Sequence, residues 1–480
     1  MNTETPSLLK TRRGASILAL LLLVQFLDFL DVSIVNVALP SIRHDLAFSQ
    51  QSLQWVVSGY VLTYGGFLLL GGRAADLIGR RRMLVAGLGL FALASLVGGI
   101  AHAEGVLIAA RLAQGTGAAL MSPAALSTLT TTFTNPRDRN AALGAWAAMP
   151  GLAGAAGVVL SGVLTEGPGW RWIFYLNIPV ALLAGVGVVA LLDAERPKRD
   201  SSFDLAGSVL VTGAMLLSIY SLVRAPDVGF GSPRTIGELA TAAGLFVAFV
   251  FNELRAKHPL VPFSIFRIKG LAAANLTQLI SFSGLYSMFF FLSLYMQNVL
   301  RYSPVHTGLA YLPVTGGFIV SVAVVTQLLP RIGTRPVIVG GAVFAAAGIY
   351  LLSHVPVHGS FVSDLLPGIV IVAFGLGGVF AGVTTAATEG VPADRAGIAS
   401  GLLNASMQFG GALGLAVLSA VATDRTRGVL DGGAALPAAL TSGFQRAFLL
   451  GTGFVAVAAT IALLAANIRA GQRPSEVDTR

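Results

Sequence analysis

Long apolar segments recur along the whole chain, and short polar links separate them. A segment of about 20 apolar residues is long enough to cross a bilayer as a helix. Because backbone groups cannot remain unpaired in lipid, segments of this kind form helices. The sequence therefore predicts an all-α protein that crosses a membrane many times. We count fourteen candidate spans, at approximately residues 15–40, 53–72, 83–102, 105–131, 140–164, 172–192, 205–224, 236–253, 271–298, 306–329, 336–354, 363–389, 396–422 and 443–467.

The composition leaves no room for a large soluble domain. Hydrophobic residues make up 55% of the chain and charged residues 11%, whereas a soluble domain carries roughly 25% charged residues. The longest polar stretches are Asp193–Phe203 and Asp424–Ser442, which we expect to be connections between spans. The first apolar run, Ile17–Leu39, is too long for a signal-peptide core and lacks a convincing cleavage site, so we expect it to be retained.

Several chemistries are excluded by residues that the chain lacks. It has no Gly-x-x-x-x-Gly-Lys-[Ser/Thr] phosphate loop, so we expect no ATP hydrolysis. The absence of cysteine excludes disulfides, iron–sulfur clusters and thiol catalysis. The six histidines form no metal-binding set, because Pro356 breaks any helix between His354 and His358. We therefore expect no enzymatic activity, no catalytic residue, no metal and no cofactor.

The positions of the basic residues define the topology. With the N-terminus inside, we assign 22 Lys and Arg residues to cytoplasmic segments and 8 to outer segments, and only Arg111 lies within a span. Cytoplasmic loops carry an excess of Lys and Arg, so this bias predicts a multi-pass protein of the cytoplasmic membrane with both termini in the cytoplasm. The net charge of +9 is accordingly a topology signal and does not indicate nucleic-acid binding.

An internal repeat divides the spans into two groups. The sequence Pro136–Arg139 precedes the fifth span, and the similar Pro392–Arg395 precedes the thirteenth. Two helices of the same direction with the same entry sequence indicate two related six-helix halves. Two spans are then left between the halves, and an amphipathic stretch, Leu254–Lys269, follows them and is expected on the inner membrane surface. The expected divisions are residues 1–200 for the first bundle, 201–255 for the inserted pair and 256–480 for the second bundle.

A basic turn joins the second and third spans and carries the pattern Gly-x-x-x-Asp-x-x-Gly-Arg-Arg. This turn resembles the signature loop of the major facilitator superfamily, and the central pair of spans resembles that of its fourteen-helix drug:proton antiporters. The resemblance implies a conformational latch, in which an aspartate bonds to the N-terminus of the thirteenth span near Ala396–Ile398. A carboxylate is stabilised at the positive end of a helix dipole. The latch residues are Gly72, Asp76, Gly79, Arg80 and Arg81.

Two carboxylates lie inside the first span. Asp28 and Asp31 are three residues apart and therefore neighbours on one flank of a helix. An intramembrane carboxylate costs roughly 2.5–3.5 kcal/mol on insertion scales, so it usually faces a cavity and has a function. Two such groups resist double ionisation, which raises the proton affinity of the pair. A proton carrier needs this property. The alternative is a structural pair that orients helices by hydrogen bonds.

The first and fourth spans also carry family-like motifs. Leu30–Pro40 resembles the first-helix motif of the fourteen-helix family, which favours Asp31 over Asp28. Arg111–Ala119 resembles the fourth-helix motif, which is linked in the family to proton transfer. Arg111 and Asp31 lie within about one helical turn of each other in depth, at roughly 1.5 Å per residue. They can therefore form an ion pair or a water-bridged pair, unless Arg111 extends outward to the interface.

Polar and aromatic residues at helical spacing predict a substrate cavity. Those in the ninth and thirteenth spans could line it, although an interhelical hydrogen bond is an equally good explanation for each amide. The predicted cavity residues are Asn36, Gln114, Asn275, Gln278, Tyr286, Phe289, Asn404, Met407 and Gln408.

The leading hypothesis is a secondary exporter that moves amphipathic organic compounds outward, driven by inward proton flow. Its partners would be a small molecule, protons and the bilayer, and we expect a monomer. No acidic residue marks the core of the second half, which favours neutral or monocationic substrates. The fifth span departs from the antiporter motif Gly-Pro-x-x-Gly-Gly, since it reads Gly157–Gly162 without the proline. A dedicated metabolite exporter, a proton symporter for uptake and a non-transporting sensor therefore remain alternatives.

Overall fold

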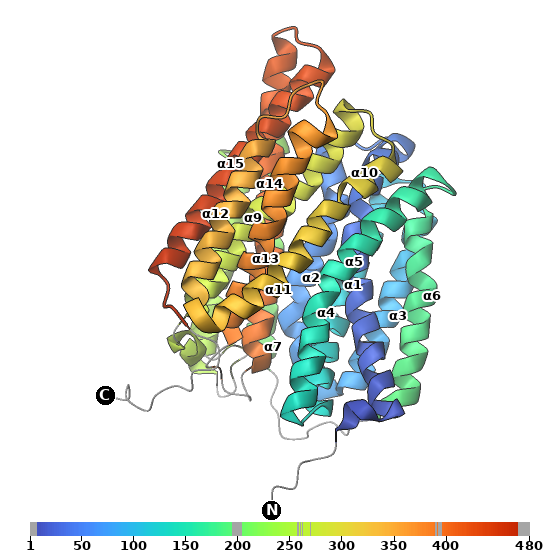
Figure 1. Ribbon diagram of the computed structural model, residues 1–480, viewed down its shortest axis with the longest axis vertical. Coiled ribbons are helices and arrows are strands. Elements are labelled where there is room, and N and C mark those ends of the chain that lie inside the picture. The colour runs from blue at the N-terminus through green and yellow to red at the C-terminus, as the bar shows by residue number, and fades with distance from the viewer. Residues whose placement is uncertain are drawn as a thin grey trace, which may run out of the picture.

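The computed structural model describes residues 7–193, 204–256, 259, 261, 263–268, 270–388, 391 and 396–468. In these residues it consists of helices joined by short connections, and it contains no strand (Figure 1). Eleven helices of the described part are long and apolar enough to cross a membrane, judged by length and composition. The prediction of an all-helical, polytopic chain is confirmed.

The helices follow the predicted spans closely. The first six are α1 (Arg12–Leu46), α2 (Gln50–Ile78), α3 (Arg80–Gly99), α4 (Glu104–Thr132), α5 (Pro136–Glu166) and α6 (Trp172–Leu191), preceded by a short 3-10 turn, η1 (Leu8–Lys10). A pair follows, α7 (Leu205–Val228) and α8 (Pro233–Arg255), and then a second 3-10 turn, η2 (Phe263–Arg267). Next come α9 (Leu271–Leu294), which ends in the π turn η3 (Tyr295–Val299), and then α10 (Pro304–Ala310) and α11 (Leu312–Ile332). Together α10 and α11 form one predicted span. The last helices are α12 (Thr334–Leu352), α13 (Leu366–Thr388) after the π turn η4 (Phe361–Leu365), α14 (Ala396–Asp431) and α15 (Leu436–Leu464).

Equivalent contacts occur in the two groups of helices. In the first group, α5 packs on α1, where the Ser33 hydroxyl donates to the Gly154 carbonyl at 2.9 Å. In the second group, α14 packs on α9, where the Ser283 hydroxyl donates to the Gly410 carbonyl at 2.9 Å. Each contact depends on glycines, which allow two helix backbones to approach closely. This correspondence supports the duplication that the paired entry sequences indicate.

The inserted pair lies beside both groups. α7 packs against α2 of the first group and α14 of the second, and α8 packs on α7. The Thr212 hydroxyl fixes α7 to α2 by donating to the Gly66 carbonyl at 2.9 Å. In the stretch that follows α8, Val261 and Ile265 are buried and Phe266 is exposed.

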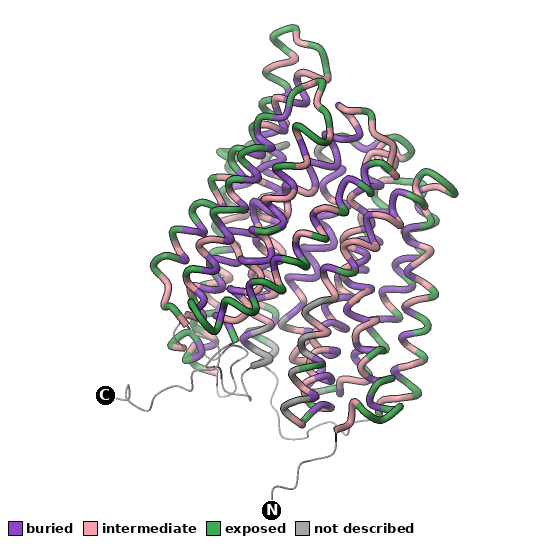
Figure 2. Tube along the Cα trace, viewed as in Figure 1, coloured by how far each residue is buried: buried purple, intermediate pink, exposed green. Residues whose placement is uncertain are grey.

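Large apolar side chains cover much of the outer surface. On α6, for example, Leu183 and Val186 are more than 60% exposed. Figure 2 shows buried residues along the inner faces of the helices and exposed ones along their outer faces. A water-exposed helix would not present such a face, whereas a helix surrounded by lipid does.

One predicted connection is largely helical. The sequence Asp424–Ser442 was expected to be a link, yet α14 continues to Asp431 and α15 begins at Leu436. Polar residues end a membrane span but need not end a helix, whose hydrogen bonds are local. The two extensions support each other, since the Arg425 guanidinium donates to the Ser442 hydroxyl at 2.9 Å. They form the projecting hairpin at the upper end of Figure 1.

Hydrogen bonds join the two groups of helices at the end of the molecule that carries this hairpin, here called the far end. The Gln297 amide, beyond α9, donates to the Val37 carbonyl of α1 at 2.8 Å. The Val305 amide of α10 donates to the Glu166 carboxylate of α5 at 3.3 Å. The opposite end, at the bottom of Figure 1, is where α1 begins and α15 ends. The far end is therefore bridged by hydrogen bonds between the two groups.

Candidate functional site

A buried ion pair occupies the interior of the first group of helices. Arg111 of α4 and Asp31 of α1 are 1% and 0% exposed, and an Arg111 terminal nitrogen lies 2.5 Å from Asp31 Oδ2. The other carboxylate oxygen of Asp31 accepts from the Gln114 amide at 3.1 Å and from the Asn177 amide at 2.7 Å. Three donors from α4 and α6 thus surround one carboxylate.

The Arg111 guanidinium is held on several sides. Its Nε donates to the Val56 carbonyl at 2.8 Å, and the terminal nitrogen that meets Asp31 also donates to Gln114 Oε1 at 2.8 Å. The Tyr60 ring stacks beneath the guanidinium at 4.6 Å. Removing one partner of a buried ion pair costs about 3–5 kcal/mol, because the other charge is left uncompensated. This pair therefore stabilises the arrangement of α1, α2 and α4.

Asp28 has a different environment, although it lies one helical turn from Asp31. Two phenol hydroxyls of α2 donate to it, Tyr60 at 2.5 Å and Tyr64 at 2.7 Å. The Tyr64 hydroxyl is also 2.9 Å from the Ser122 hydroxyl of α4. Asp28 is 1% exposed and, among the described residues, has no cationic hydrogen-bond partner. The carboxylate is thus buried with neutral partners only.

The two sites differ in how they accommodate a proton. Tyr64 carries one hydrogen between two oxygen neighbours: it can donate to ionised Asp28, or accept from protonated Asp28 and donate to Ser122. Both forms are then hydrogen-bonded without movement of a heavy atom. Asp31 faces only donors, so its protonation would break a contact with Arg111 or require the Asn177 amide to turn over. The Asp28 site suits both protonation states, and the Asp31 site suits the ionised one.

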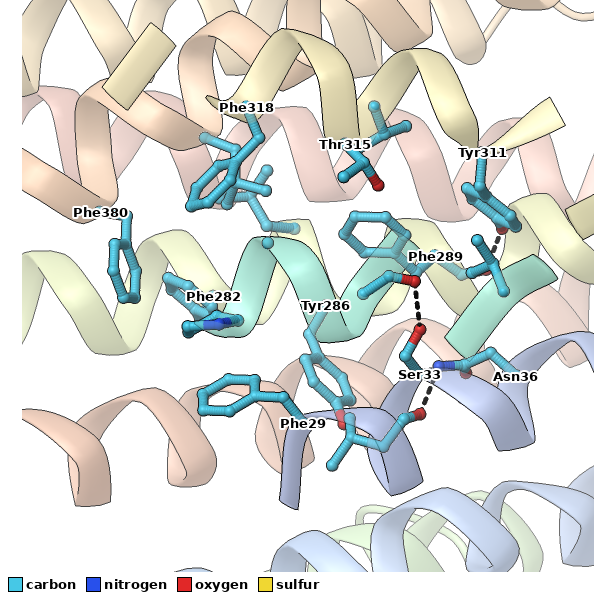
Figure 3. A pocket seen from close by; sticks show the side chains of 18 of the residues that line it. Phe29, Ser33, Asn36, Phe282, Tyr286, Phe289, Tyr311, Thr315, Phe318 and Phe380 are labelled. Atoms are coloured by element: carbon cyan, nitrogen blue, oxygen red, sulfur yellow. Dashed lines mark hydrogen bonds between the residues drawn. The ribbon is translucent and has the colours of Figure 1, made fainter. Parts of the chain in front are cut away.

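A central cavity lies beside this cluster and between the two groups of helices. It encloses about 1040 Å³ of empty space, the solvent at its mouth included. Figure 3 shows aromatic side chains converging on it from α1, α9, α11 and α13. Its wall contains no charged residue among those described, and it is formed by Phe29, Val32, Ser33, Asn36, Pro150, Gly151, Gly154, Val158, Phe282, Leu285, Tyr286, Phe289, Tyr311, Val314, Thr315, Phe318, Leu376, Phe380 and Met407.

Four of the nine predicted cavity residues line this cavity: Asn36, Tyr286, Phe289 and Met407. The other five do not line it, and an amide in an apolar helix can face a neighbouring helix instead of a cavity. Gln114 belongs to the ion-pair cluster, and Asn275 Oδ1 accepts from the Ser406 hydroxyl at 3.0 Å. The remaining three, Gln278, Asn404 and Gln408, also do not line it. The interhelical hydrogen bond, the alternative at these positions, is observed for Asn275.

The basic turn between α2 and α3 is built around one glycine. Gly79 has φ +106°, a conformation that strongly favours glycine, and it ends α2 and begins α3. Arg80 donates to the Thr131 hydroxyl at 2.6 Å, and Arg81 donates to the Val189 carbonyl at 2.7 Å. These contacts fix the turn against α4 and α6. The side chain of Asp76 and those of 396–398 lie outside the described part, as does the entry sequence 392–395.

Several site residues were not identified from the sequence. Tyr60 and Tyr64, which hold Asp28, are four residues apart on α2, and this helical spacing was an available signal. Asn177 stands alone in an apolar segment, which was a second signal. Ser122 offered none, because serine is common in helices of this kind.

Comparisons with known proteins give a consistent result. Residues 21–415 match the family model described as Major Facilitator Superfamily. The chain is 39% identical to puromycin resistance protein pur8 of Streptomyces alboniger, covering 91% of this chain and 87% of that protein. It is 37% identical to cephamycin export protein CmcT of Amycolatopsis lactamdurans, covering 92% and 90%. A crystal structure of an auto-inhibited POT family peptide transporter shares the fold, with a TM-score of 0.69, 15% identity and coverage of 96% and 99%.

Proposed function

Because this chain belongs to the major facilitator superfamily, we propose that it exports amphipathic aromatic compounds across the cytoplasmic membrane in exchange for protons. The chain is a multi-pass membrane transporter and not an enzyme. Relatives that span nearly its whole length are named as resistance or export proteins, which supports outward transport. The basic residues, 22 on one side against 8 on the other, support cytoplasmic termini.

The central cavity is the proposed binding site for the exported compound. It lies between the two groups of helices, which we propose to be halves that move against each other, with the basic turn as their latch. Aromatic and apolar side chains form most of the wall, as expected for a site that binds amphipathic molecules by burial of apolar surface.

The proton is proposed to bind at Asp28. Asp31 and Arg111 cancel each other's charge, so ionised Asp28 is the uncompensated charge of the cluster. Burial of such a charge is costly, and protonation removes it. The single observation that carries this proposal is the Tyr64 hydroxyl between Asp28 and Ser122, which accommodates both forms. The first-helix motif favours Asp31, and we propose that Asp31 stays ionised and positions Arg111.

Proteoliposomes that contain a trapped pH indicator test this function. A panel of aromatic antibiotics that includes puromycin should produce substrate-dependent proton flux with the wild-type protein. Asp28→Asn should abolish this flux and the response to an imposed pH gradient, yet retain exchange of labelled for unlabelled compound without a gradient. The matched control is Asp45→Asn, since Asp45 pairs with Arg171 at the far end, away from the cluster. Normal gradient-driven transport by Asp28→Asn would refute the assignment, and a wild-type protein that moves no compound would refute export.

A further inference from the structure

Tyr286 places an unused hydroxyl at the wall of the central cavity. The residue lies on α9, and Figure 3 shows its side chain extending toward α1, beside Phe29. Its hydroxyl oxygen is buried, and no described protein group forms a hydrogen bond with it. A buried hydroxyl without a partner is unfavourable, so this position provides a donor for a molecule that enters the cavity.

The other tyrosine of the cavity differs in this respect. Tyr311 is bonded to two groups: its hydroxyl lies 2.8 Å from the Ser293 hydroxyl and donates to the Phe289 carbonyl at 2.8 Å. The two small polar side chains on α1 are also bonded within the protein. Ser33 donates to the Gly154 carbonyl at 2.9 Å, and Asn36 donates to the Val32 carbonyl at 3.0 Å. The Ser33 and Tyr311 hydroxyls and one of the two hydrogens of the Asn36 amide are thus occupied, whereas the buried Tyr286 hydroxyl has no partner among the described residues.

The rest of the wall limits the chemistry of a ligand. Phenylalanines from α1, α9, α11 and α13 line the cavity together with Tyr286, and none of the described lining residues is charged. A formal charge on a ligand would lose hydration without gaining a counter-ion from this wall, whereas a flat aromatic ring would gain contact with the phenylalanine rings. The wall therefore suits uncharged aromatic molecules.

We propose that the exported compounds are uncharged aromatic molecules with a carbonyl group, and that the Tyr286 hydroxyl donates a hydrogen bond to the carbonyl oxygen. This inference rests on the proposed function, because it takes the central cavity as the transport site. It adds the class of substrate and the residue that selects it. A molecule without an acceptor would leave the hydroxyl unpaired, so selectivity arises from the missing hydrogen bond.

Binding of two matched ligands to the full-length protein in lipid nanodiscs tests this proposal. 9-Fluorenone and fluorene share a tricyclic skeleton and differ by the carbonyl oxygen; both are measured by displacement of Nile red, itself an uncharged aromatic carbonyl compound. The wild-type protein should bind 9-fluorenone roughly 5- to 50-fold more tightly than fluorene, as expected when a buried donor is satisfied or left unpaired. Tyr286→Phe should abolish this preference and bind fluorene as tightly as the wild type or more tightly. Retained fluorene binding also shows that the variant is folded.

Tyr311→Phe is the matched control, because it removes a phenol hydroxyl from the same cavity that is already bonded within the protein. It should keep the preference for 9-fluorenone. A preference that survives in Tyr286→Phe, or that disappears equally in Tyr311→Phe, would overturn the proposal, as would equal binding of both ligands to the wild type. The assay has no pH gradient, so failure of proton coupling leaves this result unaffected and the two proposals fail separately.

Discussion

Asp28 and Asp31 show how one helical turn can separate two roles for the same type of residue. Asp31 receives a guanidinium and two amides, while Asp28 receives two phenols. The difference comes from the neighbouring helices, since α4 and α6 supply the donors around Asp31 and α2 supplies those around Asp28. The chemistry of each carboxylate is therefore decided by its neighbours across the helices.

Substitution of Arg111 should separate its charge from its geometry. Arg111→Ala leaves Asp31 buried without a cation, which should lower the free energy of unfolding by about 3–5 kcal/mol and abolish transport. Arg111→Lys keeps the charge but cannot also bond the Val56 carbonyl and Gln114, so it should recover activity only in part. Thermal unfolding in detergent and transport in proteoliposomes measure the two effects. The neutral pair Asp31→Asn with Arg111→Gln should be more stable than Arg111→Ala; equal stability of wild type and Arg111→Ala would contradict this account.

Some site residues could be predicted from the sequence and others could not, because the two kinds of prediction need different information. Depth in the membrane follows from the rise per residue, so Asp31 and Arg111 could be placed at similar depth. The direction of a side chain around the helix axis depends on packing between helices. Gln114 and Asn275 therefore could not be assigned to a cavity or to a neighbouring helix, and Tyr60 and Tyr64 were not connected with Asp28. The spacing of asparagine and glutamine residues along a helix does not reveal which neighbouring helix or cavity their side chains face.

At the scale of elements, the first described residues are attached to the beginning of α5. Asp138, in the first turn of that helix, accepts from the Ser7 hydroxyl at 2.7 Å and from the Leu9 amide at 3.2 Å. Asp138 belongs to the entry sequence Pro136–Arg139, which is similar to the one before the thirteenth span. This similarity indicated a repeat but did not predict the contact with Ser7 and Leu9. A carboxylate can accept from any donor that packs beside it, so the partner of Asp138 could not be predicted from the pattern.

This attachment should weaken in acid. The hydrogen bond from Ser7, and then those from the backbone of residues 9 and 8, hold the pKa of Asp138 below its ordinary value. A carboxyl with a lowered pKa in the folded state stabilises that state above its ordinary pKa, and the contribution is lost as pH falls through the lowered value. Protease cleavage near Leu8 should therefore become faster below about pH 4, near the ordinary carboxyl range. Asp138→Asn should show fast cleavage at neutral pH; a pH-independent rate in the wild type would contradict this assignment.

At the scale of the whole molecule, the bridge at the far end indicates which side is closed. Gln297 connects the second group of helices to Val37 of the first, and Val305 connects to Glu166. A contact of this kind stabilises only the conformation in which it exists, so its removal changes the balance between conformations. The sequence could not predict it, because a second amide, Asn298, stands next to Gln297 and the partner is a backbone carbonyl, which every residue carries.

Gln297→Leu should therefore favour a molecule that is open at the far end. Loss of one buried hydrogen bond of about 1 kcal/mol changes the ratio of two conformations roughly fivefold. The chain contains no cysteine, so spin labels can be placed at cysteines substituted for His44 and Asp431, which are exposed near the far end in different groups. The distance distribution should gain a longer component in Gln297→Leu. Gln445→Leu is the matched control, because Gln445 donates to the Val355 carbonyl at 2.8 Å within the second group alone. If both variants lengthen the distance equally, the effect arises from the second group itself and not from the bridge between the groups.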